Sequence, residues 1–222
     1  MTVPAPHLSG SRGWLQPSSQ GLSRPLSHRL SHRLSYPFWR GWLIGLMSCV
    51  LAALPAQADP TAVSSSGFTS SFRAEIKATP AQAWGAVVQL PRWWNPAHTY
   101  SGNAANLSLD AQAGGCWCER WRDAAGASHS VQHAQVVLAQ EGRVLRLNGA
   151  FGPLQDMAVV GVLTIGTSPG TGAEAGQHFL RMTYRVAGGV EAGLDKLAAA
   201  VDGVIGEQFK RLKSLIESGQ TN

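Results

Sequence analysis

The chain has 222 residues, of which 44% are hydrophobic, and carries 18 basic against 13 acidic residues. Five arginines and no acidic residue lie within residues 1–58, so the other 13 basic residues are balanced by all 13 acidic ones. The positive net charge therefore belongs to the N-terminal segment. It does not support a nucleic-acid-binding role for the rest of the chain, and we expect no nucleic-acid partner.

Residues 1–58 are typical of a leader that ends in a secretory signal peptide. Arg40 precedes the apolar segment 41–54, and Ala56 and Ala58 are the small residues that signal peptidase requires. A helix over 41–54 spans about 21 Å, less than the roughly 30 Å of a bilayer core. We therefore expect cleavage after Ala58, no stable membrane insertion afterwards, and a periplasmic or secreted bacterial protein. A lipoprotein-type cleavage at Cys49 is the alternative, but it leaves an apolar start.

Residues 59–66 are expected to form a linker, 67–218 the folded domain and 219–222 a tail. The domain opens with a strand, because apolar or small side chains occupy every second position from Phe68 to Ile76. Thr79 and Pro80 then match the N-cap and first position of a helix that continues through 81–89.

A series of strands without an intervening helix follows. The predicted strands are 106–109, 115–122, 130–139, 143–148, 157–165 and a last one in which Leu180, Met182, Tyr184 and Val186 share a face. Glycines, as in 168–176, separate them as turns or bulges. Seven strands in sequence predict an antiparallel, strongly curved sheet.

Apolar residues spaced by three and four from Leu194 to Leu215 predict a long amphipathic helix that closes the domain. Gly203 and Gly206 lie within it, each at a cost of about 1 kcal/mol relative to alanine. They either allow close packing on the sheet or leave room for a ligand. The predicted fold class is α+β, with the curved sheet wrapped on this helix.

Two segments carry a family resemblance. Residues 78–84 (Ala-Thr-Pro-Ala-Gln-Ala-Trp) and 90–94 (Leu-Pro-Arg-Trp-Trp) resemble the opening of the SRPBCC superfamily, which includes START lipid-transfer domains, polyketide cyclases and heat-shock ATPase activator homologues. The resemblance covers about 67–217. It implies a helix-grip (START-like) fold with a deep apolar cavity and no universal catalytic residue. Three further segments resemble an exported bacterial subgroup of unassigned function: 102–110, 114–119 and 149–155.

The expected function is binding of a small apolar or lipid-like ligand in this cavity, without a cofactor. Trp93 and Trp94 are adjacent and point about 100° apart on a helix, so one of them is expected at the cavity mouth beside His98 and Tyr100. The other expected wall residues are Trp84, Leu147, Met157, Met182, Tyr184, Leu197 and Gly203.

Two other functions remain open. A cyclase- or hydrolase-type enzyme would use polar residues of the same cavity, for which His98, Glu119 and Asp202 are the candidates. The sequence contains no motif for a nucleophile, a zinc protease or a nucleotide site, so we expect binding rather than catalysis. In the simpler interpretation, His98 and Asp202 are solvated and Glu119 pairs with a nearby arginine. The third class is a protein-interaction module.

Cys116 and Cys118 are the cysteines that remain after cleavage at Ala58, in an oxidising compartment. On a regular strand their Cα atoms lie about 6.7 Å apart, at the upper limit of disulfide geometry. We therefore rank buried thiols first, a disulfide that needs a bulge second, and a metal site third. The metal site would add His133, which faces Cys118 if a two-residue turn closes the hairpin.

Overall fold

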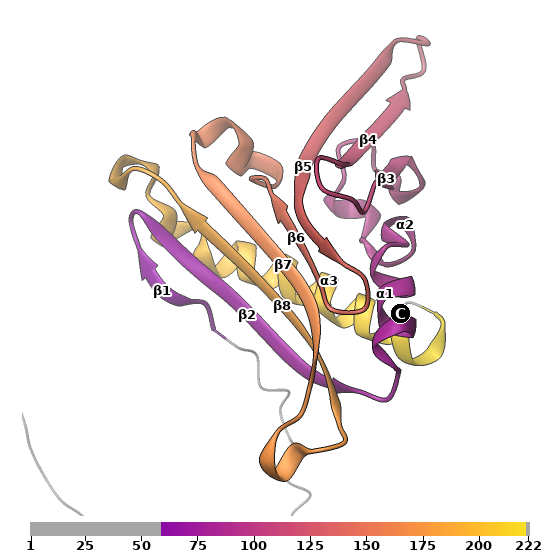
Figure 1. Ribbon diagram of the computed structural model, residues 1–222. Helices are drawn as coiled ribbons and strands as arrows, with labels where there is room; N and C mark the ends of the chain where they lie inside the picture. The colour runs from indigo at the N-terminus through magenta and orange to yellow at the C-terminus, as the bar shows by residue number, and fades with distance from the viewer. Residues whose placement is uncertain (1–58, 221–222) are drawn as a thin grey trace, which may run out of the picture. The chain divides into compact units, whose positions relative to one another are not determined.

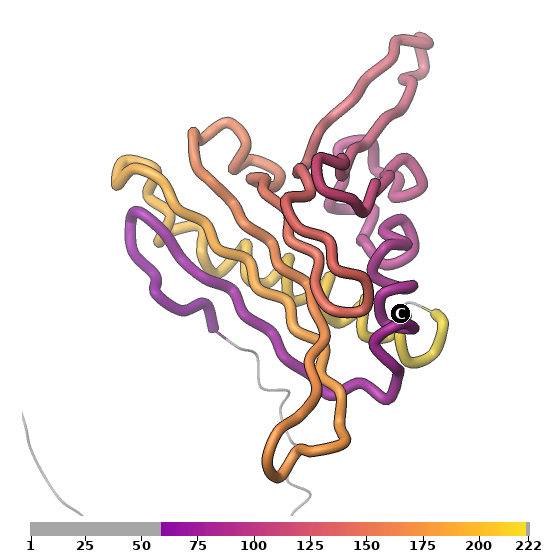
Figure 2. The backbone as a smooth tube through the Cα atoms, in the orientation of Figure 1, coloured from indigo at the N-terminus to yellow at the C-terminus, as the bar shows by residue number. Residues whose placement is uncertain are grey.

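One antiparallel sheet forms the framework of residues 59–220, the part that the computed structural model describes (Figure 1). Its eight strands follow the order β1-β2-β8-β7-β6-β5-β4-β3. Their bounds are β1 Thr61–Ser64, β2 Gly67–Ile76, β3 Leu107–Leu109, β4 Cys116–Arg122, β5 Ser128–Gln140, β6 Val144–Asn148, β7 Val160–Pro169 and β8 His178–Ala187. The sheet twists along its length, as Figure 2 shows.

Three α-helices accompany the sheet, α1 Pro80–Val87, α2 Leu90–Trp93 and α3 Ala198–Ser218. Short 3-10 turns connect the elements: η1 Pro96–His98, η2 Ala104–Asn106, η3 Gly152–Met157, η4 Gly172–Glu174, η5 Val190–Ala192 and η6 Leu194–Lys196. Helix α3 packs along one face of the sheet, against β2 and β8. No helix of residues 59–220 is long and apolar enough to cross a membrane.

The α+β class, the curved antiparallel sheet and the closing helix are confirmed, and the arrangement fits the helix-grip class. The sequence did not predict β1, whose four residues are all exposed and show no alternation. β1 lies in the expected linker and pairs with β2 at Thr61 and Thr69. β7 begins at Val160, because Met157 belongs to the preceding turn η3.

The start of α1 follows from a capping box. Thr79 Oγ1 accepts a hydrogen bond from the Gln82 backbone N–H at 3.3 Å, and Gln82 Oε1 accepts one from the Thr79 N–H at 2.9 Å. Two backbone donors that a helix start leaves unpaired are thus satisfied, with Pro80 at the first helical position. The helix buries Ala83 and Val87.

Helix α3 approaches the sheet closely at one of its two internal glycines. The rings of Phe72 and Phe209 stack with centroids 5.6 Å apart. A Cβ atom added at Gly206 would lie 3.0 Å from the Phe72 ring, whereas one added at Gly203 would meet no atom within 4 Å. Gly206 therefore serves helix packing, and Gly203 lies on the exposed face of the helix.

The pairing of β4 with β5 is interrupted once. Cys116 pairs with Gln135, and the next pairs shift by one residue, so that Cys118 lies opposite Gln132. His133 is the additional residue on β5, a β-bulge that changes the local direction of the strand. At the same point the Cα atoms of Cys116 and Cys118 are only 5.4 Å apart and the two residues form a disulfide.

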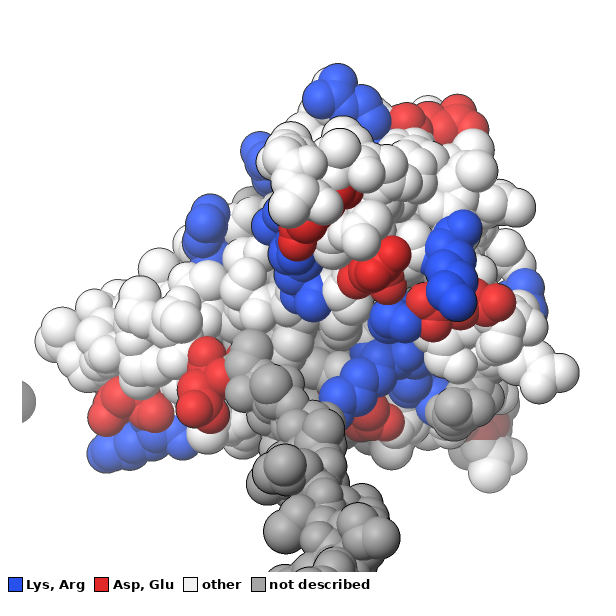
Figure 3. Space-filling view, turned by 90° about the horizontal axis from the view of Figure 1, so that it is seen from below, with Lys and Arg blue, Asp and Glu red and all other residues white. Residues whose placement is uncertain are grey.

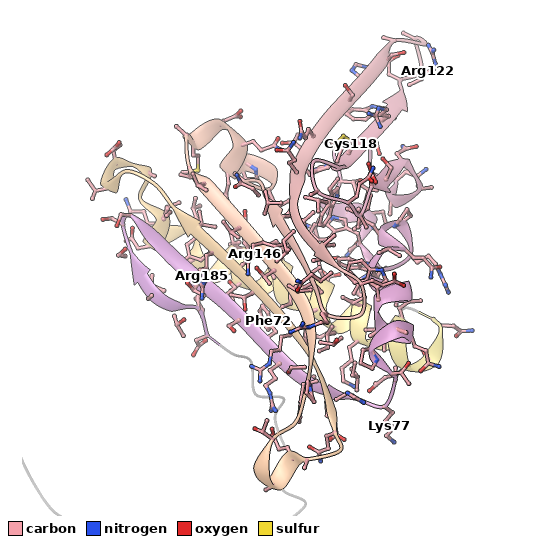
Figure 4. The ribbon with its side chains drawn as sticks, viewed as in Figure 1. Phe72, Lys77, Cys118, Arg122, Arg146 and Arg185 are labelled. Atoms are coloured by element: carbon pink, nitrogen blue, oxygen red, sulfur yellow. A yellow bond between two sulfur atoms is a disulfide. The ribbon has the colours of Figure 1, made fainter. Side chains whose placement is uncertain are left out.

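The prediction that buried thiols rank first is therefore wrong. The irregular pairing brings the two Cα atoms inside the range that a disulfide requires. The bond lies on the face of β4 opposite Trp117, and Figure 4 labels Cys118 there.

Charged residues of both signs are interspersed on one face of the domain. Figure 3 shows Lys and Arg beside Asp and Glu on the face seen from below. Arg146 on β6 and Arg185 on β8, both exposed, lie on the face of the sheet away from α3 (Figure 4).

Candidate functional site

A cavity of about 590 Å³ lies between the first turns of α3, the segment 94–100 and the segment 151–156. Its α3 wall is aliphatic and consists of Leu197, Ala200, Val201, Val204 and Ile205. Trp94, Phe151 and Leu154 contribute further apolar surface. The polar or titratable side chains at the lining are those of His98, Thr99, Tyr100, His133 and Asp156.

The two adjacent tryptophans separate because α2 ends between them. Trp93 is the last helical residue, and Trp94 has extended backbone angles, φ −73° and ψ 130°. Trp93 enters the core and donates its indole N–H to the carbonyl of Val87 at 3.1 Å. Trp94 lines the cavity, and its indole N–H donates to the carbonyl of His98 at 2.9 Å. One tryptophan thus shapes the cavity wall and also holds the loop that carries His98.

A cluster of core aromatic rings packs behind the lining residues Trp94 and Phe151. Trp117 meets Trp94 edge to face at 4.7 Å between centroids and lies 5.1 Å from Phe151. Phe151 in turn packs on Tyr184 at 5.1 Å. Tyr184 Oη donates to the carbonyl of Gly149 at 3.2 Å and accepts from the Phe151 N–H at 3.1 Å. These contacts anchor the 149–151 turn, and burial raises the pKa of Tyr184 far above its usual range, which keeps the hydroxyl neutral.

A buried carboxylate supports the polar end of the cavity. Glu119 is fully buried, and its oxygens accept hydrogen bonds from the Tyr100 N–H at 3.1 Å and the Ser101 N–H at 2.6 Å. Its Oε2 atom also lies 2.9 Å from Nε2 of His133. The expectation that Glu119 pairs with a surface arginine is therefore wrong. Two backbone amides and an imidazole satisfy it instead.

The pair has a defined protonation state. Burial raises the pKa of Glu119, but the hydrogen bonds from Ser101, Tyr100 and His133 outweigh burial and leave it below its ordinary value. Burial lowers the pKa of His133 more than the hydrogen bond and charge of Glu119 raise it. At neutral pH the pair is thus a carboxylate and a neutral imidazole. Its Nε2–H donates to Glu119, which leaves a lone pair on Nδ1.

A second carboxylate–histidine pair lies at the edge of the cavity. His98 Nε2 is 3.2 Å from Glu207 Oε2, with both side chains about one-third exposed or more. Glu207 also accepts a hydrogen bond from the Asn95 amide, and the Asn95 backbone N–H donates to Gln208 Oε1 at 2.8 Å. These contacts join the 94–100 segment to α3. Asp156 is exposed at the same edge.

Of the residues predicted for the cavity, Trp94, His98, Tyr100 and Leu197 line it. Others lie in the core outside the lining, namely Trp84, Trp93, Leu147, Met157, Met182 and Tyr184. Gly203 is exposed and does not line the cavity, and Asp202 does not reach it either.

Asp202 is buried rather than solvated at the edge of the helix stripe, so that interpretation is wrong. Burial raises the pKa of Asp202, and its Oδ1 atom has no hydrogen-bond partner among the described residues.

The sequence did not bring Glu119 and His133 together. In the sequence, Glu119 is a candidate acid or base by itself, and His133 is a candidate metal ligand beside the cysteines. One signal was available, because Trp117, Glu119 and Trp121 share a face of β4 and a carboxylate between two tryptophans points inward. The disulfide occupies both sulfur atoms. Residues 59–220 contain no cluster of three or more His, Cys, Asp or Glu suited to a metal ion.

Comparisons with known proteins name no function for this chain. No family model and no curated protein matches the chain. Among solved structures, a Chromobacterium violaceum protein is 16% identical and matches 67% of this chain and 96% of its own, with a TM-score of 0.45. A Rhodobacter sphaeroides protein is 17% identical and matches 71% of this chain and 96% of its own, with a TM-score of 0.45. A Staphylococcus aureus protein of unknown function is 11% identical and matches 69% of this chain and 95% of its own, with a TM-score of 0.48.

Proposed function

We propose that this protein binds a small apolar or amphipathic molecule in the cavity between the sheet and α3. The observation that carries the proposal is a cavity of about 590 Å³ with aliphatic and aromatic walls and few polar groups. Ligand pockets typically enclose about 300–1,000 Å³ and have this composition. The START-like helix-grip architecture that the sequence resembles has a cavity in the same place.

Burial of apolar surface would supply most of the affinity. A bicyclic ligand that buries about 200 Å² of apolar surface gains roughly 5 kcal/mol at 25 cal/mol/Å², before the cost of association. No cofactor is needed for such binding. With the leader 1–58 acting as a signal peptide, the protein would carry or sequester its ligand outside the cytoplasm.

The test is a cavity-filling substitution with a neighbouring control. Val204→Phe places a larger side chain in the cavity, whereas Gly203→Leu adds one on the exposed face of the same helix. We expect Val204→Phe to weaken binding of the neutral dye N-phenyl-1-naphthylamine at least tenfold and Gly203→Leu to leave it unchanged, as measured by fluorescence titration. If the wild type does not bind the dye, the proposal fails. Where the dye does bind, native mass spectrometry of the exported protein would identify the natural ligand.

One observation favours a second candidate, an enzyme of cyclase or hydrolase type. A neutral imidazole that a buried carboxylate orients is an arrangement suited to a general base, and His133 presents it at the cavity wall. Turnover of a panel of aryl esters that is lost in His133→Phe, but retained in His129→Phe, would support this function. Equal rates in both variants would exclude His133 as the base.

A further inference from the structure

We propose that the cavity selects an uncharged ligand that donates a hydrogen bond, such as an alcohol or phenol, and that Nδ1 of His133 accepts this bond. The inference rests on the proposed function, because it names the chemistry of the molecule that the same cavity would take. It depends on the Glu119–His133 pair, on the backbone groups that hold it and on the charge of the cavity lining.

The first step is that His133 offers an acceptor. Its Nε2–H is committed to Glu119 Oε2 at 2.9 Å, and an imidazole whose Nε2 carries the proton has a lone pair on Nδ1. His133 is more than nine-tenths buried, yet it lines the cavity. Among the described residues, the hydrogen bond of the His133 ring is made through Nε2, and none is made through Nδ1. A ligand hydroxyl would supply the missing donor.

The second step is that Glu119 fixes this state. The carboxylate is fully buried and held by the backbone N–H groups of Tyr100 and Ser101. It cannot turn away or pick up a proton without breaking those bonds, so the imidazole keeps one tautomer and one orientation. The ring of Tyr100, centred 5.8 Å from that of His133, packs beside it.

The third step is that the cavity lining has no permanently cationic side chain to stabilise an anion. Its lining contains no Lys or Arg, and its charged neighbours are the carboxylates of Glu119, Glu207 and Asp156. A fatty-acid carboxylate or a phosphate would lose its water and meet negative charge.

A cationic amine is disfavoured for a different reason. Glu119 already accepts three hydrogen bonds. The rings that pack beside His133 are those of Tyr100 and Trp117, and neither carries a negative charge. A desolvated ammonium would therefore lose more hydration than this end of the cavity replaces. An uncharged hydroxyl has the smallest desolvation cost and finds one matched acceptor.

The first experiment compares four ligands that share a naphthalene ring. The probes are naphthalene, 2-naphthol, 2-naphthoate and 2-naphthylmethylammonium, and their dissociation constants are measured at pH 7 by competition with N-phenyl-1-naphthylamine. We expect 2-naphthol to bind about fivefold more tightly than naphthalene, the value of one net hydrogen bond. The naphthoate and the ammonium should bind more weakly than 2-naphthol.

The outcomes separate the inference from the function on which it rests. If the dye does not bind, the proposed function fails. If naphthalene binds but 2-naphthol has no advantage, or if either charged probe binds most tightly, the cavity stands and the selection of a neutral donor is overturned.

The second experiment removes the acceptor. His133→Phe keeps a ring of similar size but has no lone pair, so the affinity for 2-naphthol should fall to that for naphthalene. His129→Phe is the matched control, since His129 lies on the same strand β5 but is exposed and pairs with Asp123 at the hairpin tip. Thermal melts followed by circular dichroism establish that both variants fold. A fivefold preference that survives His133→Phe overturns the proposal.

Discussion

At the scale of single residues, the decisive contact is the hydrogen bond between Glu119 and His133. Both side chains are buried, and each has a polar partner that the local sequence does not show. Burying a carboxylate is costly unless hydrogen bonds compensate. The Tyr100 and Ser101 amides provide this compensation from a segment nearly twenty residues away.

The pair should make stability depend on pH. The pKa of His133 is lower in the folded state, so below about pH 6.5 the unfolded chain binds a proton first and the free energy of unfolding falls. The pKa of Glu119 is also lowered, so its stabilisation is present above its unfolded pKa of about 4.3 and is lost as the pH falls further. Both effects have the same sign.

Urea denaturation between pH 7 and pH 4 tests this expectation. The unfolding free energy of the wild type should fall more steeply with acidification than that of the double variant Glu119→Gln/His133→Phe. Asp202, whose pKa is raised by burial, acts in the opposite direction and is common to both proteins. Parallel curves would show that the pair does not couple folding to protonation.

At the scale of elements, the two glycines of α3 have different roles. We expect Gly206→Leu to destabilise the fold by about 1–3 kcal/mol, because the new side chain would overlap the Phe72 ring. The same substitution at Gly203 meets open space and should be neutral or stabilise the helix by up to about 1 kcal/mol. Chemical denaturation of the two variants gives the comparison. Equal destabilisation would contradict the close approach at Gly206.

The disulfide between Cys116 and Cys118 should contribute little to overall stability. It closes a loop of only three residues, for which the chain-entropy estimate is about 1.6 kcal/mol. We expect the Cys116→Ser/Cys118→Ser double variant to lose no more than about 2 kcal/mol and to behave like the reduced wild type in urea denaturation. A loss of 4 kcal/mol or more would show that the bond also maintains the irregular pairing of β4 with β5.

At the scale of the whole molecule, processing remains a prediction, since residues 1–58 lie outside the described residues. We expect the exported protein to begin at Asp59, because Ala56 and Ala58 provide the small residues that signal peptidase requires. Intact-mass analysis of periplasmic material should give the mass of 59–222 less two hydrogens for the disulfide. A lipid adduct at Cys49, or retention of the leader, would contradict it.

Most of the architecture could be predicted from local patterns. Alternation defined β2 and β8, Thr79 and Pro80 marked the start of α1, and three–four spacing defined α3. Such patterns are visible because each element buries one face of its own. β1 was missed for the same reason, since all four of its residues are exposed.

The sequence by itself determined the order of elements, the α+β class and the presence of a curved sheet closed by a helix, because periodicity is a local property. Only the tertiary structure decided the content of the site. His133 is the bulge residue of β5, and this irregular pairing places it beside Glu119. Because α2 ends at Trp93, Trp94 lines the cavity while Trp93 packs in the core. A shift of one residue in a strand changes the face that a side chain reaches. The pairing across the hairpin, which spacing cannot reveal, therefore decided which polar groups face the ligand cavity.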